Sequence, residues 1–454
     1  MSWLRALVVT FSGLSLLVTS GLAQGPYTPR YAAGGHSLFA PGYQPQSEPL
    51  PSIEGYSQAP AEAWAMEPAY TEAQVPWLGL DAATTAPMLD FQNRQGDKQL
   101  LLLDSHARSG GETKVILGAQ FRVSGIAAQT NSANRFPYLG RFPTDFTGDT
   151  ATDVRLLQAN QSMIAHVGDW TTGYFETLFS DVFTFPSFNQ GSFQVRQAYV
   201  VFGNQEVTPF YLFAGKKNVS FGDFSTLSPF TQAVPWHYFA PLAEGVGAGF
   251  ANGGWNITAM ALNGSRGIRV ADSKERGHLN NFAANASYAW QPADAIRVQV
   301  GAGYLYGTIY DGTTAEHINP QIFGPRNGAW DVNGHVQLGG WHFAGEYVET
   351  ENVWPVVDHK VSAMKAEVAY DFESLGAPLW LSASWSEGIQ GASGDAWRSN
   401  AQLVVGARWT FNPHAMLSLE YVRSTGFAPL INITTVSDPD VVQDSLVVGF
   451  VLTI

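Results

Sequence analysis

The sequence contains no cysteine among its 454 residues. A disulfide framework and thiolate chemistry are therefore excluded. Charged residues are also scarce, at 14% of the chain, which is about half the usual share of a soluble domain. The 24 lysines and arginines are outnumbered by 38 aspartates and glutamates, which gives a formal net charge of -14. This acidic balance argues against a nucleic-acid-binding surface, which would need a basic stripe.

Long apolar runs are missing as well. A short run from Leu7 to Leu17 follows Arg5 and precedes the small residues Gly21 and Ala23. This order predicts a secretory signal peptide over residues 1–23, and a short membrane anchor is the less favoured alternative. No later stretch approaches the roughly twenty continuous apolar residues of a membrane helix. An exported chain of this kind can enter a membrane only as a closed β-barrel.

Two segments precede the regular part of the sequence. Residues 24–75 are rich in proline, glycine, serine and alanine, and no helical or alternating pattern survives there. They are interpreted as a disordered linker on the periplasmic side of the membrane. Residues 76–112 have a more ordinary composition, with an apolar patch at 100–103 beside Gln99 and Asp104. They could dock as a small plug or simply lead into the next domain, and the sequence leaves both arrangements open.

From Thr113 onward, the polarity of the side chains alternates with a period of two. The clearest stretch runs from Trp397 to Phe411, where Leu403 falls on one face and Gln402 and Arg408 fall on the other. Successive side chains of a strand leave on opposite faces, so one face suits an apolar environment and the other suits water. Aromatic residues at both ends of the apolar face match the interfacial girdles of a membrane strand. A high aromatic content, 13% of the chain, fits the same interpretation.

About sixteen such segments follow one another. They begin at residue 113 and continue near 154–167, 170–183, 192–203, 209–220, 244–252, 254–264, 278–290, 295–310, 328–338, 341–350, 359–371, 377–388, 397–411, 413–424 and 443–454. Short turns with Gly, Asn, Asp or Pro follow the even-numbered strands, and mostly longer connections follow the odd-numbered ones. This asymmetry predicts an all-β fold over residues 113–454: a transmembrane antiparallel β-barrel with short periplasmic turns and long extracellular loops. A barrel of this size encloses an aqueous channel rather than a packed interior.

Several short motifs resemble those of a porin family. Asp169-Trp170 followed by Tyr174-Phe175 is similar to a "DW…GF" hairpin, and the stretch from Arg196 to Val200 is similar to a "DRAFV" strand. The stretch from Pro209 to Lys216, leading to Phe221-Gly222, resembles a "PFYLTAGK…PFG" segment, and Asn263-Gly264 resembles an "FNG" hairpin end. The family is that of the LbtU-type siderophore porins, and the "GK…FG" stretch is distantly similar to the phosphate-selective porins. The resemblance implies a siderophore- or anion-type uptake channel.

The selectivity of a pore depends on charged side chains at its narrowest part. Alternation places charges of both signs in the lumen, which suggests a transverse field. The candidates are Arg122, Glu176, Arg196, Lys216, Arg297, Glu346, Lys365, Glu367, Arg398, Arg408 and Glu420. For any one of them, a solvated lumen charge without a selective role is the simpler interpretation. Arg196 and Lys216 lie on neighbouring predicted strands and are expected to contact an anionic solute.

The connection 221–243 is long and aromatic, and it includes Trp236, His237 and Tyr238. It follows the fifth predicted strand, where the inward-folding constriction loop of a porin lies. Aromatic side chains exposed to water would form an unexplained apolar patch, whereas folding into the lumen would hide them and narrow the channel. Packing over the barrel rim or against a neighbouring subunit is the alternative.

The sequence predicts no enzyme. His237, His335, His342 and His414 are scattered and lack the spacing of a metalloprotease helix, so no metal site or cofactor is expected. The sequence favours a porin of the bacterial outer membrane that passes small hydrophilic solutes and ions by passive diffusion. Its expected partners are the surrounding outer-membrane lipid and, as one possible assembly, two further copies in a homotrimer. The alternatives are a ligand-specific uptake channel and a surface adhesin or structural barrel with a closed lumen.

Overall fold

The computed structural model describes residues 77–136, 147–180, 192–264, 278–311, 326–355, 357–374, 377–395, 398–412, 414–427 and 438–454. The predicted signal peptide, the predicted linker and Trp397 lie outside these ranges. No helix within these ranges is both long and apolar enough to cross a membrane.

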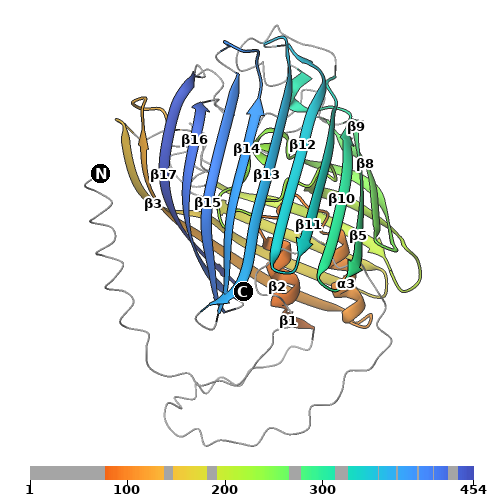
Figure 1. The fold of residues 1–454 in the computed structure, drawn as a ribbon. Helices are drawn as coiled ribbons and strands as arrows, with labels where there is room; N and C mark the ends of the chain where they lie inside the picture. Colours follow the sequence, from red (N-terminus) through yellow and green to blue (C-terminus); the bar gives the residue numbers. More distant parts are fainter. Residues whose placement is uncertain are drawn as a thin grey trace, which may run out of the picture. The chain divides into compact units, whose positions relative to one another are not determined.

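A closed antiparallel barrel of 16 strands forms the body of the protein, as the alternation predicts (Figure 1). The first eight strands are β2 (Lys114–Thr130), β3 (Thr150–Val167), β4 (Thr171–Ser180), β5 (Ser192–Gly203), β6 (Phe210–Asn218), β7 (Leu242–Asn252), β8 (Trp255–Asn263) and β9 (Leu279–Ala293). The other eight are β10 (Ile296–Leu305), β11 (Ala329–Leu338), β12 (Trp341–Trp354), β13 (His359–Ser374), β14 (Ala377–Ile389), β15 (Ser399–Asn412), β16 (Ala415–Phe427) and β17 (Asp438–Thr453). The two weakest predicted strands, 209–220 and 244–252, correspond to β6 and β7.

The ring closes between the first and last strands of the barrel. β17 pairs antiparallel with β2, in a register that runs from Gln443 opposite Thr130 to Thr453 opposite Gln120. Where β17 ends, the short strand β1 (Leu78–Leu80) pairs in parallel with β2 and continues the seam. Every strand of the barrel therefore has a partner on both sides, which leaves no long edge unpaired.

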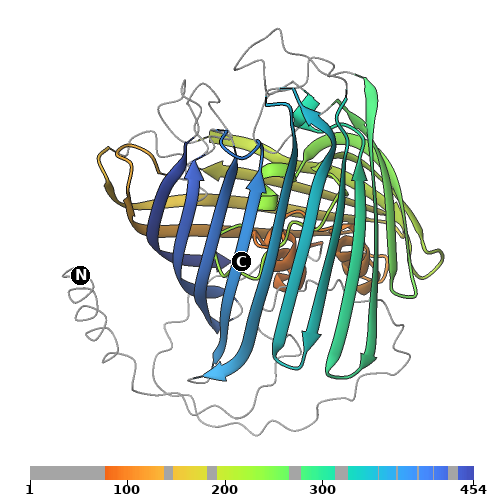
Figure 2. The same ribbon diagram turned by 45° about the horizontal axis from the view of Figure 1, so that its top comes forward.

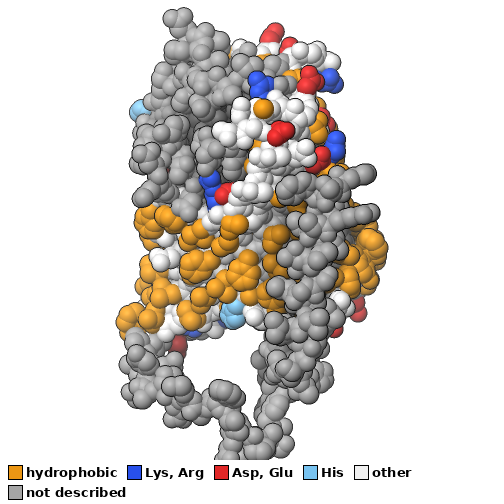
Figure 3. All heavy atoms as spheres, turned by 90° about the vertical axis from the view of Figure 1, so that its left-hand side faces the viewer, with side chains coloured by type: hydrophobic (Ala, Val, Ile, Leu, Met, Phe, Trp, Pro, Cys, Tyr) orange, Lys and Arg blue, Asp and Glu red, His pale blue; other side chains and the backbone are white. Residues whose placement is uncertain are grey.

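The two faces of the wall differ as the alternation predicts. On β15, Leu403 and Val405 are exposed on the outer face, whereas Gln402 and Arg408 point into the barrel and are buried. Figure 3 shows hydrophobic side chains gathered in a band across the wall, with most of the visible charged side chains above it. An apolar band on the outside and polar residues inside are the arrangement of a barrel that crosses a bilayer.

Aromatic pairs lie on the outer face toward both ends of the strands. Trp341 contacts Tyr370 beside the β11–β12 turn, with ring centroids 4.8 Å apart. Trp330 contacts Tyr347 toward the opposite end of the same strands, with centroids 5.3 Å apart. Amphipathic rings at two levels are expected where the wall meets the two interfaces of a membrane.

The connections divide into short turns at one end of the barrel and longer ones at the other. Gly253 and Gly254 join β7 to β8 with φ angles of 58° and 87°, a left-handed conformation that glycine adopts without strain. The helices are α2 (Ala82–Leu89), α3 (Gln99–Arg108) and α4 (Val234–Phe239), and η1 (Ile309–Asp311) is a short 3₁₀ turn. The helices α2 and α3 lie near the short-turn end in Figure 1 and remain within the ring of strands in Figure 2.

The opposite faces of β10 provide a test of the membrane-facing surface. Val300 is 53% exposed on the outer face, and its neighbour Gln299 is half-buried on the inner face. Val300→Arg should reduce the folded fraction in lipid vesicles, because an arginine facing the bilayer midplane costs about 2–4 kcal/mol. Gln299→Arg is the matched control and should fold normally. Equal folded fractions, measured from the heat-dependent gel mobility of the barrel, would contradict this assignment of the faces.

Candidate constriction site

The connection between β6 and β7, residues 219–241, lies inside the barrel. Its polar groups bond to inward-facing side chains of strands on several sides of the lumen, and most of its residues are buried. We call it the constriction loop. Of the two arrangements that the sequence allows, the structure therefore shows the inward-folded one.

Glutamates on the barrel wall accept hydrogen bonds from the backbone of the constriction loop. Glu346 on β12 accepts from the N–H groups of Asp223 (2.9 Å) and Phe224 (2.8 Å). Glu367 on β13 accepts from the N–H of Leu227 at 3.1 Å. These bonds give partners to amides that have no strand ladder of their own, and a charged acceptor makes each bond stronger.

Glu420 on β16 makes the same kind of bond further along the loop. It accepts from the N–H of Phe230 at 2.6 Å, from the N–H of Thr231 at 3.0 Å and from the Thr231 hydroxyl at 2.6 Å. Glu420 is fully buried, and burial raises the cost of leaving these donors unpaired. The loop is therefore fixed to the wall at Glu346, Glu367 and Glu420.

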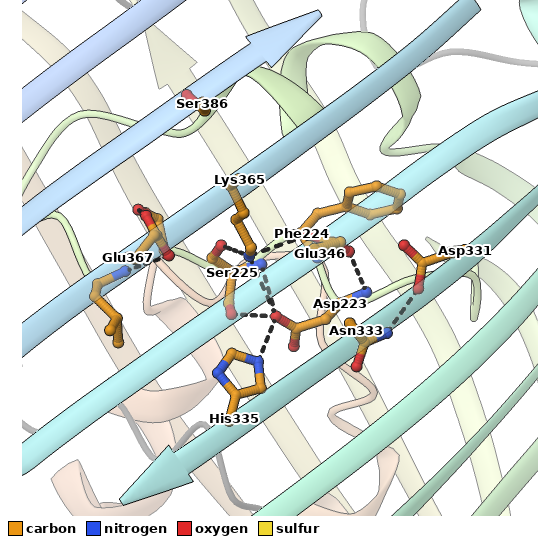
Figure 4. Close-up of polar contacts among 12 residues, drawn as sticks. Asp223, Phe224, Ser225, Asp331, Asn333, His335, Glu346, Lys365, Glu367 and Ser386 are labelled. Atoms are coloured by element: carbon orange, nitrogen blue, oxygen red, sulfur yellow. Dashed lines mark hydrogen bonds and ion pairs between the residues drawn. The ribbon is translucent and has the colours of Figure 1, made fainter.

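A cluster of opposite charges surrounds the start of the loop (Figure 4). The Oδ2 atom of Asp223 lies 2.9 Å from Nε2 of His335 and 3.5 Å from Nζ of Lys365. The same lysine lies 3.0 Å from Oε2 of Glu346. Burial alone would raise the pKa of Asp223, but His335, Lys365 and the Ser225 hydroxyl outweigh it and hold this pKa well below its usual range.

Arginines support the loop with aromatic contacts. Nη2 of Arg122 donates to the carbonyl of Phe230 at 3.0 Å, and its guanidinium lies over the rings of Phe91 (3.8 Å to the centroid) and Phe230 (4.4 Å). Arg408 lies over the ring of Trp380 at 5.0 Å, and the indole N–H of Trp380 donates to the Leu227 carbonyl at 2.8 Å. Each stack adds about 0.5–2 kcal/mol.

Arg196 points into the barrel because of a β-bulge. In the pairing of β4 with β5, Glu176 lies opposite Gln197 and Thr177 lies opposite Val195, so Arg196 is the extra residue. Bulges redirect side chains, and here Arg196 and Gln197 are both buried. Nη2 of Arg196 donates to Oδ1 of Asn218 at 2.8 Å. Glu176 accepts from Nε2 of Gln197 at 2.8 Å, and Oε1 of Gln197 accepts from the N–H of Asn218 at 3.2 Å, so Arg196 and Glu176 belong to one polar network.

The prediction for Lys216 is wrong. On β6, Tyr211 and Phe213 are buried and Leu212 is exposed, so Lys216 shares the outer face with Leu212. Its Nζ donates to the carbonyl of Val195 at 2.8 Å in an exposed position. Lys217, the next residue, is the one that faces inward. The alternation does not separate these two adjacent lysines, because the inward-facing residues before them, Tyr211 and Phe213, are apolar.

The other predicted residues lie in different places. Arg297 is exposed near the short-turn end of β10, and Arg398 is exposed just before β15. In α4, Trp236 and Tyr238 are buried and His237 is partly buried, and the Trp236 ring lies 5.7 Å from the ring of Phe91. The structure therefore does not bring Arg297 and Arg398 to the constriction loop.

The sequence does not reveal which residues of the N-terminal segment contact the constriction loop and the inner wall. Nε2 of Gln92 donates to the Ser228 carbonyl at 2.8 Å, and Asp97 lies 3.6 Å from Lys217. A glutamine in the sequence does not indicate which backbone group its side chain contacts. Asp97 likewise has no neighbouring motif that distinguishes it from the other aspartates. Among the described residues, no group of three or more His, Asp or Glu side chains could hold a metal ion.

No protein-family model and no curated protein sequence matches this chain. Among solved structures, it is similar to OmpF of Salmonella typhi, at 14% identity over 76% of this chain and 99% of that chain, with a TM-score of 0.50. It is also similar to OprB of Pseudomonas putida, at 8% identity over 77% of this chain and 96% of that chain, with a TM-score of 0.50. An anion-selective porin of Comamonas acidovorans aligns at 10% identity over 76% of this chain and 100% of that chain, with a TM-score of 0.49. The chain has the fold of the outer-membrane porins.

Removing a glutamate anchor should release the constriction loop. Glu420→Ala leaves two buried amides without an acceptor, at a cost of about 1–3 kcal/mol for each. The variant should become sensitive to proteases within residues 219–241. Glu420→Gln keeps one acceptor oxygen and should be intermediate. A cleavage pattern identical to that of the wild type would show that this bond does not hold the loop.

The Asp223 cluster should make stability depend on acid pH. Since the pKa of Asp223 is lower in the folded protein, its contribution is complete above the ordinary aspartate pKa near 4 and declines as the pH falls below it. The difference in unfolding temperature between the wild type and Asp223→Asn should therefore be smaller at pH 3 than at pH 7. A difference that is independent of pH would remove the electrostatic explanation.

Proposed function

We propose that this protein forms a water-filled channel in a bacterial outer membrane through which small hydrophilic solutes and ions diffuse passively. The observation that carries the proposal is the constriction loop, which is fixed inside a barrel whose outer wall is apolar. Charged side chains of both signs surround this loop: Glu346, Glu367 and Glu420 on one hand, and Arg122 and Arg408 on the other. Ions passing such a loop experience a strong local field.

A ligand-specific uptake channel is the second candidate. The sequence resemblance to LbtU-type porins favours it. The tight packing of the lumen supports it independently, because Arg122 and Arg408 are each only 2% exposed to water. A general pore with a wide lumen would leave such side chains hydrated. The network around Arg196 is the proposed contact for an anionic group of the solute.

The assembly and the N-terminal region form part of the same proposal. The band of exposed outward-facing side chains would contact the lipid of the outer membrane. A homotrimer is the assembly to be tested. A signal peptide over residues 1–23 would direct export, and residues 24–75 would form a periplasmic linker.

Current recordings in planar bilayers test the proposed channel. The purified wild-type protein should give stepwise currents. Under a potassium chloride gradient, Arg196→Ala should shift the reversal potential toward cation preference, because a buried positive charge on the inner wall is lost. Arg398→Ala, which removes an exposed arginine next to β15, is the control and should leave the reversal potential unchanged.

Two results would oppose the proposal at different levels. Folded protein that gives no current at any voltage would favour a structural barrel or adhesin. Currents with an unchanged reversal potential in Arg196→Ala would preserve the channel and discard Arg196 as a selectivity residue.

A further inference from the structure

Residues 77–110 begin at the wall, where β1 pairs with β2, and then continue into the barrel. The segment, which we call the lumen segment, comprises β1, α2, α3 and the turns that join them. Helix α2 packs so closely on β2 that a β-carbon added to Gly118 would fall 2.6 Å from the β-carbon of Thr85. Only glycine at position 118 allows this approach without a shift. The fit to the wall is therefore specific.

One aspartate attaches the lumen segment to another part of the wall, at β6 and β8. Asp97 accepts from the Ser220 hydroxyl at 2.6 Å and from the Thr258 hydroxyl on β8 at 3.1 Å. Nζ of Lys217 on β6 lies 3.6 Å from the same carboxylate. Asp97 therefore contacts β6, β8 and the constriction loop at once.

Two glutamines attach the lumen segment to the constriction loop. Nε2 of Gln95 donates to the carbonyls of Val219 (3.0 Å) and Pro241 (2.9 Å), which are the two ends of the loop. The side chain of Gln92 both accepts and donates hydrogen bonds. Its Oε1 accepts from Nη2 of Arg122 at 3.3 Å, and its Nε2 donates to the carbonyl of Ser228. The segment and the loop therefore support each other inside the lumen.

Helix α3 attaches the segment to the short-turn end of the barrel. The ring nitrogens of His106 lie 2.7 Å from the Thr172 hydroxyl and 2.7 Å from the Gly168 carbonyl in the β3–β4 turn. Ser105 lies 3.1 Å from Nε2 of His166. Leu102 and Leu103 are buried in the same apolar cluster as Tyr211 of β6.

The interface of the lumen segment combines polar and apolar contacts. Each of its hydrogen bonds contributes only about 0.5–1.5 kcal/mol, because water replaces it when it breaks, and Met88, Leu102 and Leu103 bury apolar side chains beside them. Helices of 8 and 10 residues are too short to be stable alone, so they would lose order on leaving the wall. Gly110 and Gly111, with φ angles of 64° and 78°, join the segment to β2 and provide a hinge.

We propose that the lumen segment is a reversible plug, and that the arrangement described here is the closed state of the channel. This inference rests on the proposed channel function and adds regulation to it. Opening requires release of the Asp97 and Gln95 contacts, which withdraws the segment toward the short-turn end. Withdrawal also removes the support from both ends of the constriction loop, so the two elements that fill the lumen loosen together.

Single-channel conductance of the full-length protein tests the plug. Asp97→Ala removes a contact to three parts of the wall and should raise the open probability or the conductance several-fold. Asp104→Ala changes the same residue type on the half-exposed face of α3 and should behave as the wild type. Deletion of residues 77–110 should give the largest current. Equal currents in the wild type, Asp97→Ala and the deletion variant would overturn the plug and leave the channel intact.

Cysteine labelling gives a second readout that does not depend on current. Because the chain has no cysteine of its own, Ser105→Cys provides a unique buried thiol. A maleimide reagent should label it slowly, and several-fold faster when Asp97→Ala is added. Asp104→Cys should be labelled rapidly in both backgrounds. Equal rates at positions 105 and 104 in the otherwise wild-type protein would show that the segment is not docked.

The two measurements separate the two proposals. In one outcome, labelling at Ser105→Cys is slow and becomes faster with Asp97→Ala, but no folded variant, including the deletion, gives current. That outcome would support a detachable segment and overturn the channel. Currents that do not change with docking would keep the channel and overturn the plug.

Discussion

This structure depends on the hydrogen bonds that the backbone of the constriction loop donates to carboxylates of the inner wall. A chain that crosses a lumen has amide groups without a ladder partner, and each must be paired or remain in contact with water. Glu346, Glu367 and Glu420 provide charged acceptors from separate strands. The loop therefore has a defined position, and the charges that attach it are the same charges that a passing ion would meet.

The barrel itself could be predicted because the membrane imposes a simple pattern. Each strand needs an apolar outer side chain at every second position, so Leu403 and Gln402 alone indicate the two faces of β15. The pattern is ambiguous on β6, where the inward-facing Tyr211 and Phe213 are apolar and two adjacent lysines follow. Alternation therefore predicts the wrong one of the two, Lys216, to face inward.

The sequence predicts several individual residues of the candidate site but not the contacts that bring them together. Alternation placed Arg196 in the lumen, yet a bulge is what directs Arg196 and Gln197 to the same side. The docking of residues 77–110 depends on amide and carboxylate contacts between segments distant in the sequence, such as Gln95 with Val219. Such contacts follow no period, so the sequence leaves open whether this segment docks as a plug or only leads into the barrel. The result is a lumen that holds two elements, the constriction loop and the lumen segment, which support each other through Gln92 and Gln95.

Hydrogen–deuterium exchange of the full-length protein in lipid vesicles tests the central claim most directly. If the glutamates hold the constriction loop, the amides of Phe224, Leu227, Phe230 and Thr231 should exchange as slowly as those of β6 and β7. Exchange of these amides at the rate of an exposed loop would contradict the account, because the loop would then not be fixed inside the barrel.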